Sequence, residues 1–199
     1  MKALDANDQP QTTERELPEL ENFERCEVMR PEEAEAFLAD TERFDPREVD
    51  HIRRVAFQDR AGDRDEQGET TGDYLRGEVR IFRPSEDLAS SPEARRAVIE
   101  DTLCHEVGHG IWERAPASER ARWTLMVHRW KQNGDAAHPW ISDYAKGGAE
   151  EHFCEAYAAF TRNDATRALL TQLDSHRPEH RSLAQGVQRL RTAALTRQR

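Results

Sequence analysis

The residues of this 199-residue chain that are best suited to chemistry lie in the segment His105-Glu106-Val107-Gly108-His109. On a helix, residues four apart lie on one face, so both imidazoles can bind one metal ion. Glu106 lies about 100° round the same helix, where its carboxylate can reach a water molecule on that ion. This H-E-x-x-H spacing predicts a zinc site in which His105 and His109 are ligands and Glu106 is the general base.

A catalytic zinc ion needs a third protein ligand and an open position for water. A longer motif, with Gly at position 112 and His at position 115, would supply that ligand from the next turns. The chain has Trp112 and Ala115 instead, so the metzincin class is excluded. We therefore expect the third ligand to come from a later helix.

The segment from residue 149 to 160, AEEHFCEAYAAF, offers three carboxylates for this role, those of Glu150, Glu151 and Glu155. Only Glu151 is followed four residues later by another acid, Glu155, which can accept the second N–H of a ligating histidine. We predict that Glu151 is the third ligand and that Glu155 orients one of the histidines. Glu150, Glu155 and His138 stay open as alternative ligands. The alternative to any metal role is that the acids of this segment are solvated on an exposed helix face.

Hydrolysis of a peptide also needs a donor for the oxyanion of the tetrahedral intermediate. Tyr144 lies seven residues before Glu151, and Gly147-Gly148 allows a sharp turn between them. Tyr144 is therefore the candidate, with an ordinary loop tyrosine as the alternative. Cys104 and Cys154 adjoin site residues, and we interpret both as buried packing thiols rather than a redox switch.

The pattern of apolar residues predicts an α+β fold that is mostly helical, with a small sheet and a central H-E-x-x-H helix. The central helix is expected to begin at Pro92, with Ser90 and Glu93 forming a capping box. The strand at 78–82 is expected to be the sheet edge along which an extended substrate lies. Helices are expected at 31–39, 92–113, 116–133, 149–161 and, as one or two covering helices broken near Pro178, between 169 and 194; strands are expected at 49–58 and 77–83, flanking a mobile polar loop.

Composition and charge limit the classes of function. The net charge is −10. Residues 1–24 hold seven acidic and two basic residues, so this segment contributes half of the net charge. This acidity argues against nucleic acid as a partner. We expect a flexible acidic tail over 1–25 and a single domain over 26–199. The absence of a long apolar run predicts no membrane span and no classical signal peptide, and three cysteines indicate a reducing compartment.

Taken together, these motifs resemble the gluzincin metallopeptidases, in particular the catalytic domain of anthrax lethal factor and the Pro-Pro endopeptidases. The resemblance covers roughly residues 45–185 and rests on HEVGH, then S-x-Y, then E-x-x-x-E-A-aromatic seven residues after the tyrosine. It implies a zincin-like fold, Zn²⁺ bound by His105, His109 and Glu151, and a general base at Glu106. It also implies an oxyanion donor at Tyr144 and an orienting carboxylate at Glu155.

The expected function is a zinc-dependent endopeptidase that cleaves a protein or peptide substrate, as a bacterial effector or toxin-like protease. Such a protease would be cytoplasmic, or exported without a classical signal, with an immunity or secretion protein as a possible partner. The alternatives are an intracellular regulatory protease that cleaves a repressor, and a non-catalytic metal-binding interaction module.

Overall fold

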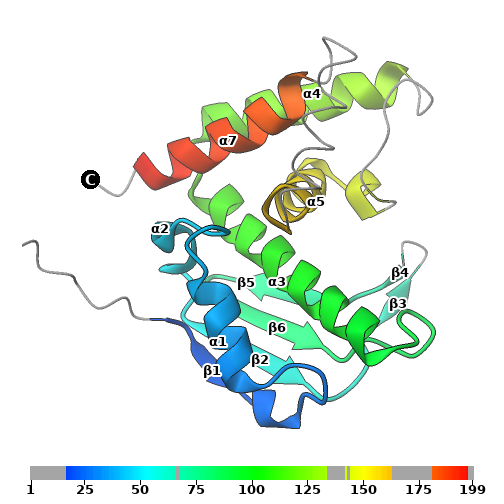
Figure 1. Ribbon diagram of the computed structural model, residues 1–199. Coiled ribbons are helices and arrows are strands. Elements are labelled where there is room, and N and C mark those ends of the chain that lie inside the picture. The colour runs from blue at the N-terminus through cyan, green and yellow to red at the C-terminus, as the bar shows by residue number, and fades with distance from the viewer. Residues whose placement is uncertain (1–16, 66–67, 134–141, 143, 163–180, 197–199) are drawn as a thin grey trace, which may run out of the picture.

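The computed structural model describes residues 17–65, 68–133, 142, 144–162 and 181–196. It has an α+β fold, as predicted, with a small mixed sheet in one half and packed helices in the other (Figure 1). The described elements of the first half are β1 (Glu19–Glu21), a 3₁₀ turn (Phe23–Arg25), α1 (Pro31–Ala39), α2 (Pro46–Val49), β2 (Arg54–Gln58), β3 (Arg64–Asp65), β4 (Gly68–Glu69), β5 (Gly72–Leu75) and β6 (Glu78–Phe82). They are followed by α3 (Pro92–Arg114), α4 (Ala117–Asn133), a 3₁₀ turn (Tyr144–Lys146), α5 (Ala149–Arg162) and α7 (Arg181–Thr196).

The four-stranded sheet has the order β1-β2-β6-β5. β1, β2 and β6 are parallel, whereas β5 is antiparallel to β6, with Tyr74 opposite Val79. Two edge strands therefore remain, β1 and β5. The strand at 78–82 exists as predicted, but it is paired on both sides, so the prediction that it is the substrate edge is wrong.

The folded domain begins earlier than the predicted boundary at residue 26. Glu19–Glu21 pairs with β2, and the Phe23 side chain after it is buried in the core. A three-residue strand with two glutamates has no apolar alternation of its own, so only its partner strand stabilises it. The predicted strand at 49–58 is also shorter and begins at Arg54, because Val49 ends the short helix α2, which follows the capping residue Asp45.

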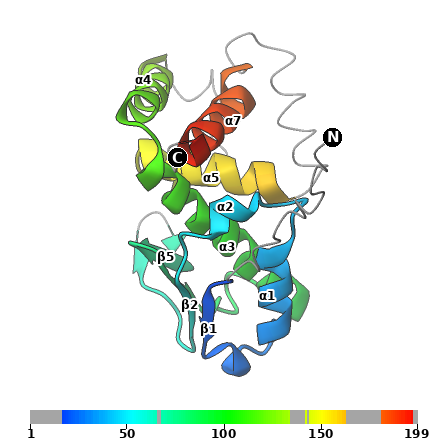
Figure 2. The same cartoon turned by 90° about the vertical axis from the view of Figure 1, so that its left-hand side faces the viewer.

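The central helix α3 matches its predicted range and lies over one face of the sheet beside α1 (Figures 1 and 2). Its N-cap is Ser91, whose hydroxyl accepts a hydrogen bond from the backbone N–H of Ala94, so the predicted capping box from Ser90 does not form. The core beneath α3 contains apolar residues at helical spacing, including Ile99, Leu103 and Ile111. This packing fixes which face of α3 is turned toward α5.

The helix α5 crosses α3 and is covered in turn by α4 and α7 (Figure 1). Phe153 and Tyr157 on one side of α5 are fully buried, as the aromatic face predicted. Gly108 on α3 permits the close approach, because a Cβ there would lie 3.1 Å from the Cα of Cys154. The C-terminal covering helix α7 begins at Arg181; the rest of the predicted C-terminal helical segment, including Pro178, lies outside the described residues.

The two halves of the molecule are joined by a buried ion pair. Glu48 of α2 is completely buried and accepts hydrogen bonds from the Arg191 guanidinium of α7 and from the backbone N–H of Asp45. Breaking such a pair leaves an uncompensated charge in the interior. The pair therefore fixes where α7 sits on the first half.

Candidate metal centre and active site

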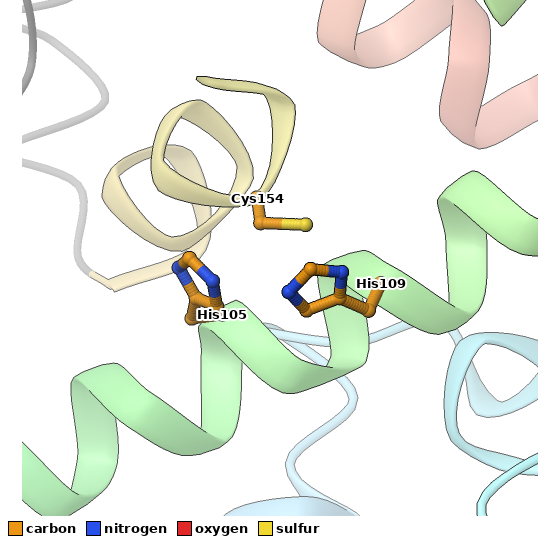
Figure 3. A group of neighbouring side chains, drawn as sticks. All are labelled: His105, His109 and Cys154. Atoms are coloured by element: carbon orange, nitrogen blue, oxygen red, sulfur yellow. The ribbon is translucent and has the colours of Figure 1, made fainter. Parts of the chain in front are cut away.

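His105 and His109 lie one turn apart on α3, as predicted, and both rings face the helix α5 (Figure 3). Their ring centroids are 5.0 Å apart. Both imidazoles are largely buried, with 10% and 14% of their side chains exposed. Two neighbouring Nε2 atoms in a shielded site are suited to bind one metal ion.

Glu151 brings a carboxylate oxygen to both of these nitrogen atoms. Its Oε2 lies 3.2 Å from His105 Nε2 and 3.7 Å from His109 Nε2. Ligand atoms about 2.1 Å from a tetrahedral zinc ion are themselves about 3.4 Å apart. Glu151 Oε2 is also a buried atom without a hydrogen bond of good geometry. These distances and this orphaned oxygen fit a metal ion between the three side chains.

Cys154 supplies a further donor that the sequence reasoning treated only as a packing thiol. Its sulfur and one ring nitrogen from each of His105 and His109 all lie within 4.8 Å of one another (Figure 3). The described residues thus contain a His105-His109-Cys154 group that could hold a metal ion. Cys154 follows Glu151 by three residues and lies near the same face of α5, but only the packing of α5 on α3 brings it to the histidines. Burial raises the pKa of this thiol well above its usual value.

Two more carboxylates of α5 lie behind the histidines. Glu155 Oε1 is 2.8 Å from His105 Nδ1, which agrees with the predicted orienting role. Glu150 Oε1 is 2.9 Å from His109 Nδ1, a contact that the sequence reasoning did not assign. A carboxylate on Nδ1 fixes a proton there, which makes Nε2 the nitrogen that would bind a metal ion.

The carboxylates of this cluster stabilise a positive charge on His105. Burial by itself lowers the pKa of His105, but the carboxylates of Glu151 and Glu155 outweigh it and raise that pKa to about 10. The pKa values of both glutamates are lowered despite burial, because His105 stabilises their charged forms. The metal-free cluster therefore keeps a proton on His105, and a metal ion would have to displace that proton on binding.

Glu106 is buried beside the histidines, with 3% of its surface exposed and its Oε2 atom without a hydrogen bond. Burial raises the pKa of its carboxyl group to about 7. The edge strand approaches it closely: a Cβ on Gly72 would lie 2.7 Å from Glu106 Oε1. A carboxylate with this pKa can both accept and return a proton near neutral pH.

Tyr144 lies on the same side of the site as Glu106. Its ring centroid is 5.8 Å from that of His105, and it lines the same cavity as His105 and Glu106. The 3₁₀ turn at Tyr144–Lys146 places it directly before α5. The predicted candidate is thus brought to the site, whereas His138 lies outside the described residues.

Tyr74 on β5 supports the second histidine, which the sequence gave no reason to expect. Its ring is stacked parallel to that of His109, at 6.1 Å between centroids and 8° between planes. Its hydroxyl donates a hydrogen bond to Glu113, 2.8 Å away. The edge strand that passes the site is therefore β5, and not the strand at 78–82 that the sequence predicted.

Comparisons of the chain with known families, curated proteins and solved structures gave no match. The function must therefore be argued from the geometry of the site. Among the described helices, none combines the length and the apolar character that crossing a bilayer requires.

Proposed function

We propose that this protein is a zinc-dependent endopeptidase with a zincin-like fold and a gluzincin ligand set. The proposal rests on one observation above all, the position of Glu151 Oε2 between the Nε2 atoms of His105 and His109. In this proposal these three residues hold the ion. Zinc bound there would acidify a water molecule and polarise the carbonyl group of the substrate.

The chain's own residues supply the remaining steps. The Glu106 carboxylate accepts a proton from the attacking water and passes it to the leaving amine. Tyr144 donates a hydrogen bond to the oxyanion as the tetrahedral intermediate forms. Glu155 and Glu150 hold the Nδ1 protons of His105 and His109, and β5 pairs with the backbone of the peptide.

The experiment that tests this function compares the parent protein with Glu106→Gln, each loaded with zinc. We expect Glu106→Gln to keep stoichiometric zinc, measured by elemental analysis, and to lose at least about 10²-fold in turnover. New N-termini are mapped by mass spectrometry in a lysate treated with each protein. A set of cleavages made by the parent alone supports the proposal, whereas cleavage by both at the same rate contradicts it.

The alternative of a non-catalytic metal module is favoured by Cys154. Four protein ligands, His105, His109, Glu151 and Cys154, would close the coordination sphere, as structural zinc sites do. The variants Cys154→Ser and Glu151→Ala separate the two functions. The peptidase proposal predicts that zinc is retained in Cys154→Ser and lost in Glu151→Ala. Cobalt substitution adds a spectroscopic test, since a thiolate-to-cobalt charge-transfer band in the parent protein would favour the closed site.

The biological role is a separate part of the proposal. An exported effector or toxin-like protease and an intracellular protease that cleaves a repressor would use the same site residues. The identity of the proteins cleaved in host and in bacterial lysates distinguishes these roles. An immunity or secretion protein encoded nearby would favour the effector.

A further inference from the structure

A cavity of about 470 Å³ continues from the candidate active site between α3 and α5. His105, Glu106 and Tyr144 are among the residues that line it. Cavities of this size accommodate a large side chain or a small ligand. Its position beside the general base makes it a pocket for a substrate residue next to the scissile bond.

Part of the pocket wall is hydrocarbon. Val98 from α3, Ala158 and Ala159 from α5, and Leu88 from the preceding loop line it. Leu88 keeps 44% of its surface exposed, which is unusual among the large apolar side chains described here. Such walls suit the aliphatic stem of a long side chain.

The charged groups of the pocket are mainly acidic. Among the described residues that line it, four carry carboxyl groups, whereas Arg162 carries a guanidinium group and His105 an imidazole that would be neutral when bound to zinc. The four acids are Glu69, Asp101, Glu106 and Glu155. An acidic substrate side chain would therefore be repelled, and a basic one would be attracted.

Asp101 lies where the charged end of a bound substrate side chain would be recognised. It precedes His105 by four residues on α3, which is about 6 Å along the helix axis and within reach of a lysine or arginine stem. Asp101 Oδ2 is 2.7 Å from Arg162 Nη1, so this ion pair joins α3 to α5 across the pocket. The Asp101 side chain remains 34% exposed, which leaves it accessible to a second cation.

Building on the proposed peptidase function, we infer that the enzyme prefers substrates with a lysine or arginine at one of the two positions flanking the scissile bond, and that Asp101 recognises its charged end. Arg162 competes for the same carboxylate and so limits the affinity of the pocket. Asp101 and Arg162 are therefore the specificity-determining residues of this pocket, with effects of opposite sign.

The first experiment uses the zinc-loaded full chain and a peptide series built on a cleavage site found in a lysate. Lysine, arginine, leucine, glutamine and glutamate are placed in turn at each of the two flanking positions. At one position we expect kcat/KM for lysine and arginine to exceed that for leucine by about 10-fold, and glutamate to be the poorest. A preference for leucine or glutamate at both positions overturns the inference.

The second experiment uses variants of the pocket. Asp101→Asn is expected to lower kcat/KM for the lysine and arginine peptides about 10-fold and for the leucine peptide less than about 2-fold. Arg162→Gln is expected to raise it several-fold for the basic peptides only. Glu100→Gln is the matched control, because Glu100 is the neighbour of Asp101 on α3 but pairs with Arg96. Equal effects on all peptides would show that Asp101 is only structural.

A binding measurement keeps this inference separate from the proposed function. Fluorescent lysine and leucine peptides are titrated against zinc-loaded Glu106→Gln, which retains the pocket. A binding preference for lysine without cleavage by the parent protein would contradict the peptidase function alone. Cleavage by the parent without any preference for a basic residue would contradict the pocket assignment alone.

Discussion

At the scale of single residues, the site is organised by carboxylates that come from one helix. Glu151 faces the Nε2 atoms of the two histidines, whereas Glu155 and Glu150 each contact a different Nδ1 atom. Three acids within one and a half turns of helix would repel one another without a cation among them. Each histidine therefore has its own carboxylate at Nδ1, and the two histidines share Glu151 at their Nε2 atoms.

Replacing Glu150 tests whether its contact with His109 matters for the metal. We expect Glu150→Ala to weaken zinc binding about 10- to 100-fold, because His109 loses the acceptor that orients it. Glu150→Gln keeps an acceptor and should restore most of the affinity. Competition with a chromophoric chelator measures both constants, and equal affinity of the alanine variant and the parent would contradict the role. Glu32→Ala, on the exposed surface of α1, is the control.

Replacing Tyr144 tests the oxyanion donor. Tyr144→Phe removes the hydroxyl and keeps the ring, so zinc content and the folded structure should be unchanged. We expect kcat to fall by about 10² to 10³-fold with little change in KM, as for the loss of one oxyanion donor. Steady-state kinetics on the best peptide provide the measurement. Unchanged kcat would place the donor elsewhere.

At the scale of elements, α3 and α5 were predicted well because their signals are local. The apolar stripes and the ends of both helices can be recognised within the segments themselves, and the H-E-x-x-H spacing then places both histidines on one face of α3. Glu151 and Glu155 could be assigned for the same reason, since their spacing implies one side of α5. Their contacts with His105 follow from the crossing of the two helices.

The edges of the sheet were not predicted, because their signals are not local. β5 is a four-residue strand, Gly-Asp-Tyr-Leu, that begins with a glycine, and β1 is a three-residue strand with two acids. Neither shows a clear alternation, and both exist through pairing with β6 and β2. Assigning β6 to the edge followed from missing β5. The contact of Cys154 with the histidines was missed because helix packing, not spacing alone, decides it.

The close approach of β5 to α3 leads to a prediction at Gly72. A Cβ there would lie 2.4 Å from Thr102 Cγ2 and 2.7 Å from Glu106 Oε1, so the Glu106 carboxylate must move in Gly72→Ala. We expect turnover to fall by at least about 10-fold, since small displacements of catalytic groups are costly. Zinc content should stay at the parent value. Leu75→Ala, on the exposed end of the same strand, is the control. A fully active Gly72→Ala variant would show that Glu106 is not held by this strand.

At the scale of the whole molecule, stability depends on pH through the half-buried His51 and the buried His152. Burial and the nearby Arg114 charge lower the pKa of His51 to about 3, and burial lowers that of His152 to about 4. Below pH 6.5 the unfolded chain takes up protons at these residues that the folded chain does not. Their contribution to stability is thus complete above pH 6.5 and is lost as the pH falls.

The variant His51→Phe isolates one of these contributions. Phenylalanine keeps a ring beside Tyr74, 6.0 Å from the present imidazole centroid, and does not titrate. The free energy of unfolding of the parent minus that of the variant should be constant above pH 6.5. Between pH 6.5 and about pH 4 it should decrease by up to about 1.4 kcal/mol per pH unit. Urea denaturation at each pH measures the difference, and a difference independent of pH would contradict the assignment.

The crossing of α3 and α5 at the candidate metal site would have a thermodynamic consequence. The histidines belong to the helix that lies on the sheet, and the glutamates belong to the helical half above it (Figure 1). A single ion bound to both helices would be a cross-link between distant parts of the chain, present only in the folded protein. Its binding energy would then add to the cohesion of the two halves, and the melting temperature would rise with the concentration of free metal.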